Sequence, residues 1–143
     1  YANQAVTDAQ RDLAESTMRA VGMVVWVDDE QQMDAVTALS GSGPAYFFLT
    51  MEVMQAAAER LGLDEKTARL LTLETALGAA RMALESSEDA ATLRARVTSP
   101  GGTTAAALAE FEKAGLAEIY GKALSAAANR AAEIGDELGA QSA

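Results

Sequence analysis

One predicted helix, at residues 44–61, restricts what this 143-residue chain can fold into more than any other segment. Its first half, from Ala45 to Met51, is almost wholly apolar, and Val53, Met54 and three alanines follow. A helix that is apolar on all sides must be buried on all sides. Because a chain of this length buries only about two-thirds of its unfolded surface, we expect a second subunit to supply one wall.

Helical spacing of apolar residues and helix start signals recur along the rest of the chain. Thr7 followed by Gln10 is a capping-box pattern, Asp64 is a predicted N-cap, and Ser87 is expected to cap a short helix that carries Leu93 and Val97. The other expected helices span residues 8–20, 30–39, 44–61, 64–84, 103–113 and 116–138. From residue 31 onward the pattern therefore predicts one all-α unit, a bundle of about six helices.

Residues 23–27, Met-Val-Val-Trp-Val, are β-branched and aromatic and predict a short strand. A lone strand is not stable without partners. The segment is therefore either an irregular connector or one strand of a sheet whose other strands lie outside this sequence. The chain also begins at Tyr1 without a methionine, so we expect a piece of a longer protein.

The chain contains neither cysteine nor histidine. This excludes a thiolate nucleophile, a Ser-His-Asp triad, an imidazole base and a thiolate-imidazole zinc site, and we expect no metal site. A net charge of −10 without a basic stripe argues against a nucleic-acid partner. No apolar run reaches the roughly 18–20 residues that cross a bilayer, and the lack of cysteine suits a cytoplasmic location.

A glycine-rich loop at residues 99–104, Ser-Pro-Gly-Gly-Thr-Thr, is the main candidate for a binding site. Two glycines allow the backbone to turn tightly and approach a ligand. The helix that follows has unpaired N–H groups at its start, which favour an anion. The residues alone leave a second interpretation open, in which the segment is only a loop with an N-cap threonine.

A second glycine-containing segment, residues 40–44 with the sequence Ser-Gly-Ser-Gly-Pro, precedes the apolar helix. It could bring backbone close to a ligand, but it lacks the spacing and the preceding strand of a dinucleotide fingerprint. A helix kink where two elements meet is the alternative. The acidic pairs, among them Glu88 with Asp89, are interpreted as solvated helix faces, and the scattered arginines as surface or ion-pair residues.

Residues 33–46 and 97–104 together closely resemble pyrroline-5-carboxylate reductase, the family that makes proline. The resemblance covers nearly the whole chain, and the second segment is a family signature. It implies a helical domain similar to the C-terminal domain of 6-phosphogluconate dehydrogenase, which forms an interleaved dimer. Residues 1–30 then correspond to the last helix and strand of a truncated Rossmann domain, and residues 31–143 to the helical dimerisation and substrate-binding domain.

The resemblance also implies an activity, the last step of proline biosynthesis. The family reduces 1-pyrroline-5-carboxylate to L-proline by hydride transfer from NADPH or NADH. The cofactor would be bound mainly by an N-terminal domain absent from this sequence, so the chain alone is expected to dimerise but to be inactive. The family's dimers often assemble into decamers.

Site residues carry over from the family to the loop at residues 99–104. Backbone N–H groups around Gly101, Gly102 and Thr103, with Ser99, would hold the substrate carboxylate. Thr104 would hydrogen-bond the ring nitrogen as the catalytic residue. Ser42 and Gly43 are expected next to the cofactor. The family commonly has a smaller residue in place of Thr103. The resemblance therefore supports a role for the Thr103 side chain less than it supports the roles of the other loop residues.

Two other functions remain open from the sequence. The chain could be a non-enzymatic helical oligomerisation module, since its apolar helix alone explains self-association. It could also be the helical domain of another dehydrogenase with a related architecture, although such a protein should not carry the proline-type loop.

Overall fold

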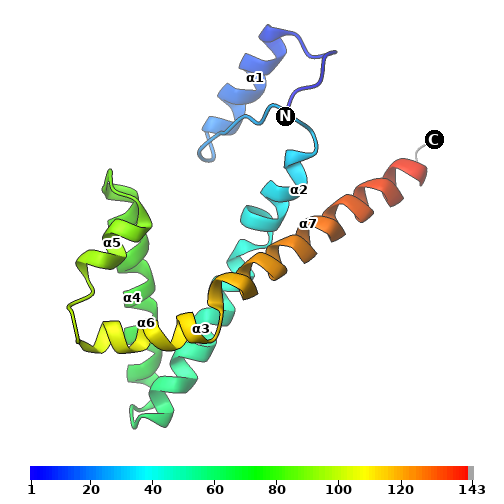
Figure 1. Ribbon diagram of the computed structural model, residues 1–143. Helices are drawn as coiled ribbons and strands as arrows, with labels where there is room; N and C mark the ends of the chain where they lie inside the picture. Colours follow the sequence, from blue (N-terminus) through cyan, green and yellow to red (C-terminus); the bar gives the residue numbers. More distant parts are fainter. Residues whose placement is uncertain (142–143) are drawn as a thin grey trace. The chain divides into compact units, whose positions relative to one another are not determined.

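The structure, a computed structural model, describes residues 1–141, and their regular secondary structure is entirely helical (Figure 1). The predicted all-α class is confirmed. The elements are α1 (Asp8–Arg19), α2 (Gln32–Val36), the π-helical turn η1 (Thr37–Gly41), α3 (Gly43–Arg60), α4 (Glu65–Glu85), α5 (Ala90–Arg96), α6 (Thr103–Lys113) and α7 (Leu116–Gln141). Six α-helices therefore follow residue 31 in the described part of the chain, as predicted.

The chain divides by its internal contacts into two compact units. One unit consists of residues 1–42 with the residues from Lys122 onward, and the other runs from Gly43 to Gly121. This division concerns contacts within one chain. The predicted boundary at residue 30 separates a truncated Rossmann domain from a helical domain, which these contacts do not test, so it stays a prediction.

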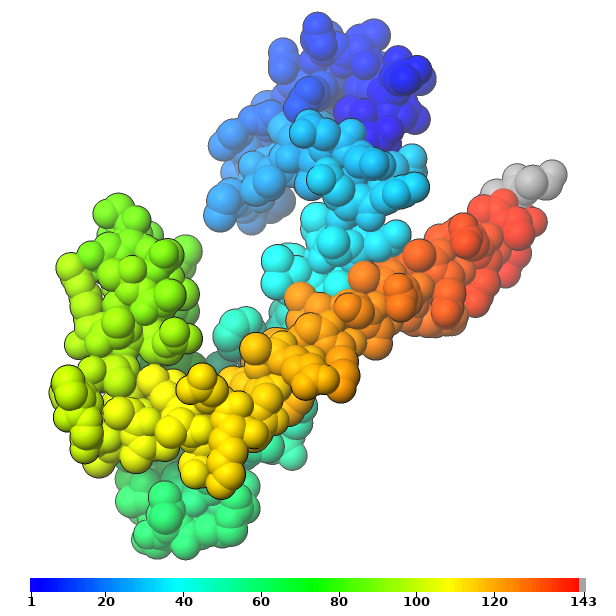
Figure 2. Space-filling view, viewed as in Figure 1, coloured from blue at the N-terminus to red at the C-terminus, as the bar shows by residue number. Residues whose placement is uncertain are grey.

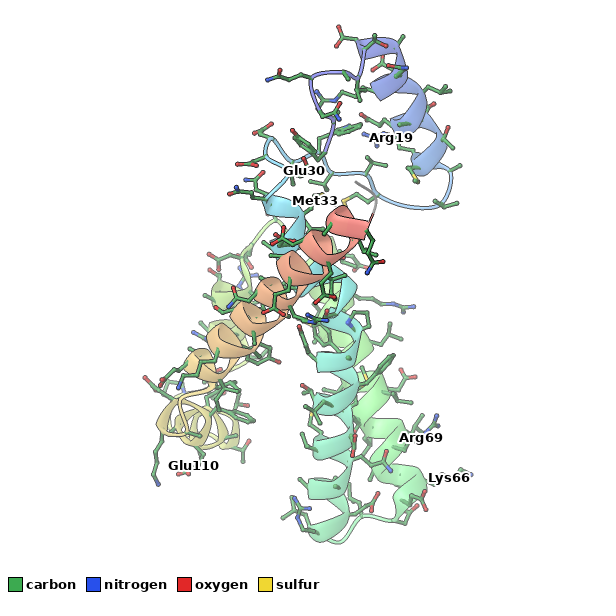
Figure 3. The ribbon with its side chains drawn as sticks, turned by 90° about the vertical axis from the view of Figure 1, so that its right-hand side faces the viewer. Arg19, Glu30, Met33, Lys66, Arg69 and Glu110 are labelled. Atoms are coloured by element: carbon green, nitrogen blue, oxygen red, sulfur yellow. The ribbon has the colours of Figure 1, made fainter. Side chains whose placement is uncertain are left out.

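In the second unit, α3 and α4 form an antiparallel hairpin (Figure 1). The carboxylate of Asp64 accepts the Thr67 N–H at 3.0 Å and caps α4, as the sequence predicts. Ala68 and Thr72 on α4 are buried, whereas Lys66 and Arg69 point away from α3 (Figure 3). The small side chain of Ala68 lets the two helices approach closely.

The short helix α5 is capped by a different residue from the one predicted. Asp89, not Ser87, is the N-cap, and its carboxylate accepts the Thr92 N–H at 2.7 Å. A carboxylate at this position interacts more favourably with the positive end of the helix dipole than a hydroxyl does. Hydrogen bonds from Thr92 accordingly hold the pKa of Asp89 below its ordinary value.

In the first unit, α1 begins with the predicted capping box. Thr7 and Gln10 exchange backbone and side-chain hydrogen bonds in both directions. After α1, the Trp26 indole N–H donates to Glu15 at 2.7 Å, and the Arg11 guanidinium lies 4.4 Å from the Trp26 ring centroid. These contacts fasten the segment after α1 back onto that helix.

The predicted strand at residues 23–27 is wrong for this chain. The segment lies between α1 and α2 and is an irregular connector in the structure. A strand needs a neighbour to pair its backbone groups, and the described residues contain no strand. The alternative interpretation of the segment as a connector is the one observed.

A π-helical turn stands where the sequence predicts an interruption before Pro44. The Ser42 N–H donates to the Thr37 carbonyl at 2.8 Å, five residues back. Proline inside a continuous α-helix lacks an N–H donor and clashes with the carbonyl four residues earlier, here that of Ser40. The wider turn ends one helix, so that Pro44 lies in the first turn of α3, where its missing N–H is no loss.

The described residues bury very little apolar surface within one chain. Ala38 and Ala68 are the only buried apolar side chains among them. The apolar helix α3 leaves Phe47, Phe48 and Leu49 largely exposed. Among the helices of residues 1–141, none combines the length and the apolar character that a membrane span requires.

Candidate functional site

The candidate site is the loop between α5 and α6, and short-range hydrogen bonds set its shape. At its beginning, the Thr98 hydroxyl donates to the Arg94 carbonyl at 2.6 Å and extends the last turn of α5. At its end, the Gly102 N–H donates to the Ser99 carbonyl at 3.0 Å and closes a tight turn. The loop is therefore an ordered turn between two helices.

Both glycines suit this geometry, for different reasons. Gly101 has a φ of +70°, in the left-handed region that other residues rarely adopt. A Cβ on Gly102 would lie 3.1 Å from the Ser99 carbonyl oxygen and 3.3 Å from the Ser99 Cβ. The first glycine therefore permits the turn, and the second permits the close approach of the two ends of the turn.

The start of α6 offers backbone donors that no side chain caps. Gly102 is the N-cap of α6 and has no side chain to accept a hydrogen bond, unlike the N-cap residues of α1, α4 and α5. The backbone ladder of α6 begins with the Ala106 N–H, which donates to the Gly102 carbonyl at 3.1 Å. The N–H groups of Thr103, Thr104 and Ala105 precede that bond and are oriented toward the helix start.

The loop is open to solvent in the single chain. Ser99, Pro100, Gly101 and Thr103 are exposed, and Thr104 is half-buried. In Figure 2, the yellow-green surface between α5 and α6 lies uncovered on the face shown. Cavities of about 930, 500 and 300 Å³ occur within the two units, but other residues line them. One chain therefore presents an accessible surface here, not an enclosed pocket.

The electrostatics of the loop come from backbone dipoles. Residues 99–104 carry no charged side chain, so the hydroxyls of Ser99, Thr103 and Thr104 are neutral donors. Such an arrangement can hold one small anion, because the N–H groups and the helix dipole favour negative charge. The described residues contain no cluster of acidic side chains that could hold a metal ion.

The predicted site residues fall into two local features. The structure brings Ser99, Gly101, Gly102, Thr103 and Thr104 together in one turn at the start of α6. Ser42 follows the π-helical turn, and Gly43 begins α3 and is buried. Their position next to a cofactor stays a prediction.

One ion pair near the loop was not predicted from the sequence. The Arg96 guanidinium lies 2.5 Å from the carboxylate of Glu88, which the sequence analysis treated as part of a solvated acidic pair. The two residues are eight positions apart, outside the spacings of three and four that mark helical pairs. The pair could have been predicted from one pattern: a short helix that ends in a basic residue and has an acidic residue just before its N-cap.

Comparison with known proteins agrees with the resemblance noted in the sequence. The family model described as pyrroline-5-carboxylate reductase dimerisation matches residues 30–134. Pyrroline-5-carboxylate reductase from Pseudomonas aeruginosa is 55% identical over 139 residues, which are 97% of this chain and 51% of that protein. The enzyme from Haemophilus influenzae is 47% identical over 135 residues, or 94% of this chain and 50% of that protein.

Solved structures show the same similarity. The structure of a pyrroline-5-carboxylate reductase from Coxiella burnetii matches with a TM-score of 0.87 and 57% identity, over 92% of this chain and 48% of that one. A pyrroline carboxylate reductase from Plasmodium falciparum, with NADP bound, matches with a TM-score of 0.80 and 30% identity, over 90% of this chain and 48% of that one.

This chain spans about half the length of the curated relatives it matches. The family model nevertheless extends from α2 into α7, includes the loop at residues 99–104 and covers well over half of the sequence. The chain therefore belongs to the pyrroline-5-carboxylate reductase dimerisation family.

Proposed function

We propose that this chain is the dimerisation and substrate-binding half of a reductase that converts 1-pyrroline-5-carboxylate to L-proline, the last step of proline biosynthesis. The observation that carries the proposal is the uncapped start of α6 behind the Gly101–Gly102 turn. Family membership identifies the anion that these donors would hold as the substrate carboxylate.

The loop would bind the carboxylate mainly through its backbone. The Gly102 N–H already closes the turn onto Ser99, so the N–H groups of Thr103, Thr104 and Ala105 are the available donors at the helix start, with the Ser99 hydroxyl beside them. Gly101 and Gly102 would contribute by allowing the carboxylate to come close to the main chain. Because the chain as a whole carries a charge of −10, the attraction for the anion has to be local.

Thr104 would act on the reacting ring. Thr104 is the second residue of α6, and its hydroxyl would hydrogen-bond the ring nitrogen of the protonated imine. A protonated C=N bond is already electrophilic, so the protein has to orient the ring and stabilise the proton at nitrogen. Histidine and cysteine are not required for this chemistry.

A nicotinamide cofactor supplies the hydride when it is bound. The described residues contain no strand followed by a glycine-rich turn and helix, so they do not form a site for the cofactor phosphates. We assign binding of NADPH or NADH mainly to a separate cofactor domain, with Ser42 and Gly43 next to the nicotinamide. Cytoplasm is the proposed location.

Self-association is the second part of the proposal, with a homodimer as the basic unit and a decamer as a further assembly. Within α3, the side chains of Phe47, Phe48 and Leu49 are largely exposed in the single chain. Exposed apolar residues on α3 supply the driving force, and an interleaved arrangement of the long helices would cover them.

The same apolar surface would suit a non-enzymatic oligomerisation module. The two functions differ at the loop, since a module that only associates has no need for a glycine turn that leaves a helix start uncapped. A test of the loop therefore separates them.

A fusion protein provides this test. The cofactor half of the Pseudomonas aeruginosa relative is joined to the start of this chain, and oxidation of NADPH is measured with 1-pyrroline-5-carboxylate. Thr104→Val should lower turnover by about 10- to 100-fold, because one hydrogen bond to a charged group contributes about 1.5–3 kcal/mol. Thr75→Val, at an exposed position on α4, is the control. Equal turnover in all three proteins would remove Thr104 from the reaction.

A further inference from the structure

We propose that the ion pair between Glu88 and Arg96 positions the loop at residues 99–104, so that both residues are positioning residues for the proposed carboxylate site. The inference rests on the proposed function for its ligand. The claim that the ion pair positions the loop does not depend on the ligand, and it involves only residues of the unit from Gly43 to Gly121.

The loop has little packing of its own to hold it. Ser99, Pro100 and Gly101 are exposed, and the hydrogen bond from Gly102 to Ser99 fixes the loop's internal shape but not its direction. The direction in which the chain leaves α5 must therefore be set before Ser99. The Thr98 hydroxyl ties that point to the Arg94 carbonyl in the last turn of the helix.

Helix α5 is too short to be stable alone. It has seven residues, whereas isolated helices shorter than about 12–15 residues are marginal in water. Asp89 caps its first turn. Arg96 is its last residue and reaches back to Glu88, which precedes the cap. The ion pair therefore joins the two ends of α5 and stabilises the last turn, three residues before the loop.

The ion pair is partly shielded from solvent on the Glu88 side. The Glu88 side chain is 28% exposed, and its buried Oε2 atom has Arg96 as its ionic partner but accepts no hydrogen bond, whereas the Arg96 side chain is 65% exposed. The Glu88 N–H also donates to the Ser86 hydroxyl at 3.0 Å, which fixes the residue between α4 and α5. Glu88 is therefore an anchor, and Arg96 links the end of α5 to it.

Amide hydrogen exchange on the 143-residue chain measures the structural part of the proposal. In Arg96→Gln and in Glu88→Gln, exchange at the Gly102 amide should become about threefold to fivefold faster. Arg94→Gln is the matched control, because it removes the same charge from the same helical turn and leaves the ion pair in place. Arg96→Lys, which keeps the charge, should restore most of the protection.

A second amide separates positioning from general loss of stability. The Ala68 N–H donates to the Asp64 carbonyl at 2.9 Å in the first turn of α4, where the Ala68 side chain is buried. Its exchange should be the same in every variant. Faster exchange at Ala68 and Gly102 together would mean that the pair only stabilises the unit, and would overturn the positioning role.

Binding of L-proline, followed by NMR on the same variants, tests the link to the site. Its affinity should fall by about threefold to fivefold in Arg96→Gln and Glu88→Gln, and should be unchanged in Arg94→Gln. Unchanged affinity and unchanged Gly102 exchange would overturn the inference. If the unsubstituted chain binds no L-proline, the proposed function fails, while the exchange measurements still decide whether the pair positions the loop.

Discussion

Replacing Phe47 by alanine should weaken self-association of the chain by about a thousandfold. Phe47 lies on α3 and is 66% exposed in the single chain, although the helix around it is almost entirely apolar. A phenylalanine side chain can bury about 150–250 Å², so about 130 Å² of Phe47 is available to a partner.

The magnitude follows from this area. At about 25 cal/mol per Å², burial of the exposed part contributes about 3 kcal/mol for each copy. Alanine keeps part of that area, so the loss is about 2 kcal/mol for each copy, or about 4 kcal/mol in a symmetric dimer. Since every 1.4 kcal/mol is about tenfold in the dissociation constant, the expected change is about 10³-fold.

Sedimentation velocity over a range of protein concentrations measures the effect directly. Glu52→Ala, on the same helix at an exposed polar position, is the control and should leave the dissociation constant unchanged. The reasoning is refuted if Phe47→Ala and Glu52→Ala associate equally well, or if the unsubstituted chain is a monomer at micromolar concentration.

Two further predictions concern the loop and α1. Gly102→Ala should weaken L-proline binding, measured by NMR titration, because its Cβ would lie 3.1 Å from the Ser99 carbonyl oxygen. Hydrogen bonds from Trp26 and Arg19 lower the pKa of Glu15 below its ordinary value of 4.5. The charged hydrogen bond between Trp26 and Glu15 is therefore fully formed above pH 4.5 and is lost as the pH falls through the lower pKa of the folded state. Trp26, the only tryptophan, should show this acid transition in its fluorescence, and Glu15→Gln should abolish it.

Features encoded within one helical turn were predictable from the sequence. The capping box of Thr7 and Gln10, the Asp64 cap and the bounds of α6 all depend on interactions between residues three or four apart. The candidate loop was also found in this way, since two glycines followed by a helix start mark a local backbone geometry.

Features that depend on more distant contacts were not predictable in the same way. The strand at residues 23–27 has suitable residue types, but strand formation requires a partner that the described residues do not provide. The π-helical turn before Pro44 depends on how one helix ends and the next begins. The cap of α5 is Asp89 and not the predicted Ser87, because the helix begins two residues later than predicted, and the ion pair of Glu88 spans the whole helix.

A comparison of two ligands tests most directly whether the start of α6 binds a carboxylate. The labelled chain is titrated with L-proline and, separately, with pyrrolidine, which has the same ring without the carboxylate. Saturable shifts of the Thr103 and Thr104 amides with L-proline alone are the expected result. Equal shifts with pyrrolidine, or L-proline shifts confined to residues outside 99–104, would contradict the proposed site.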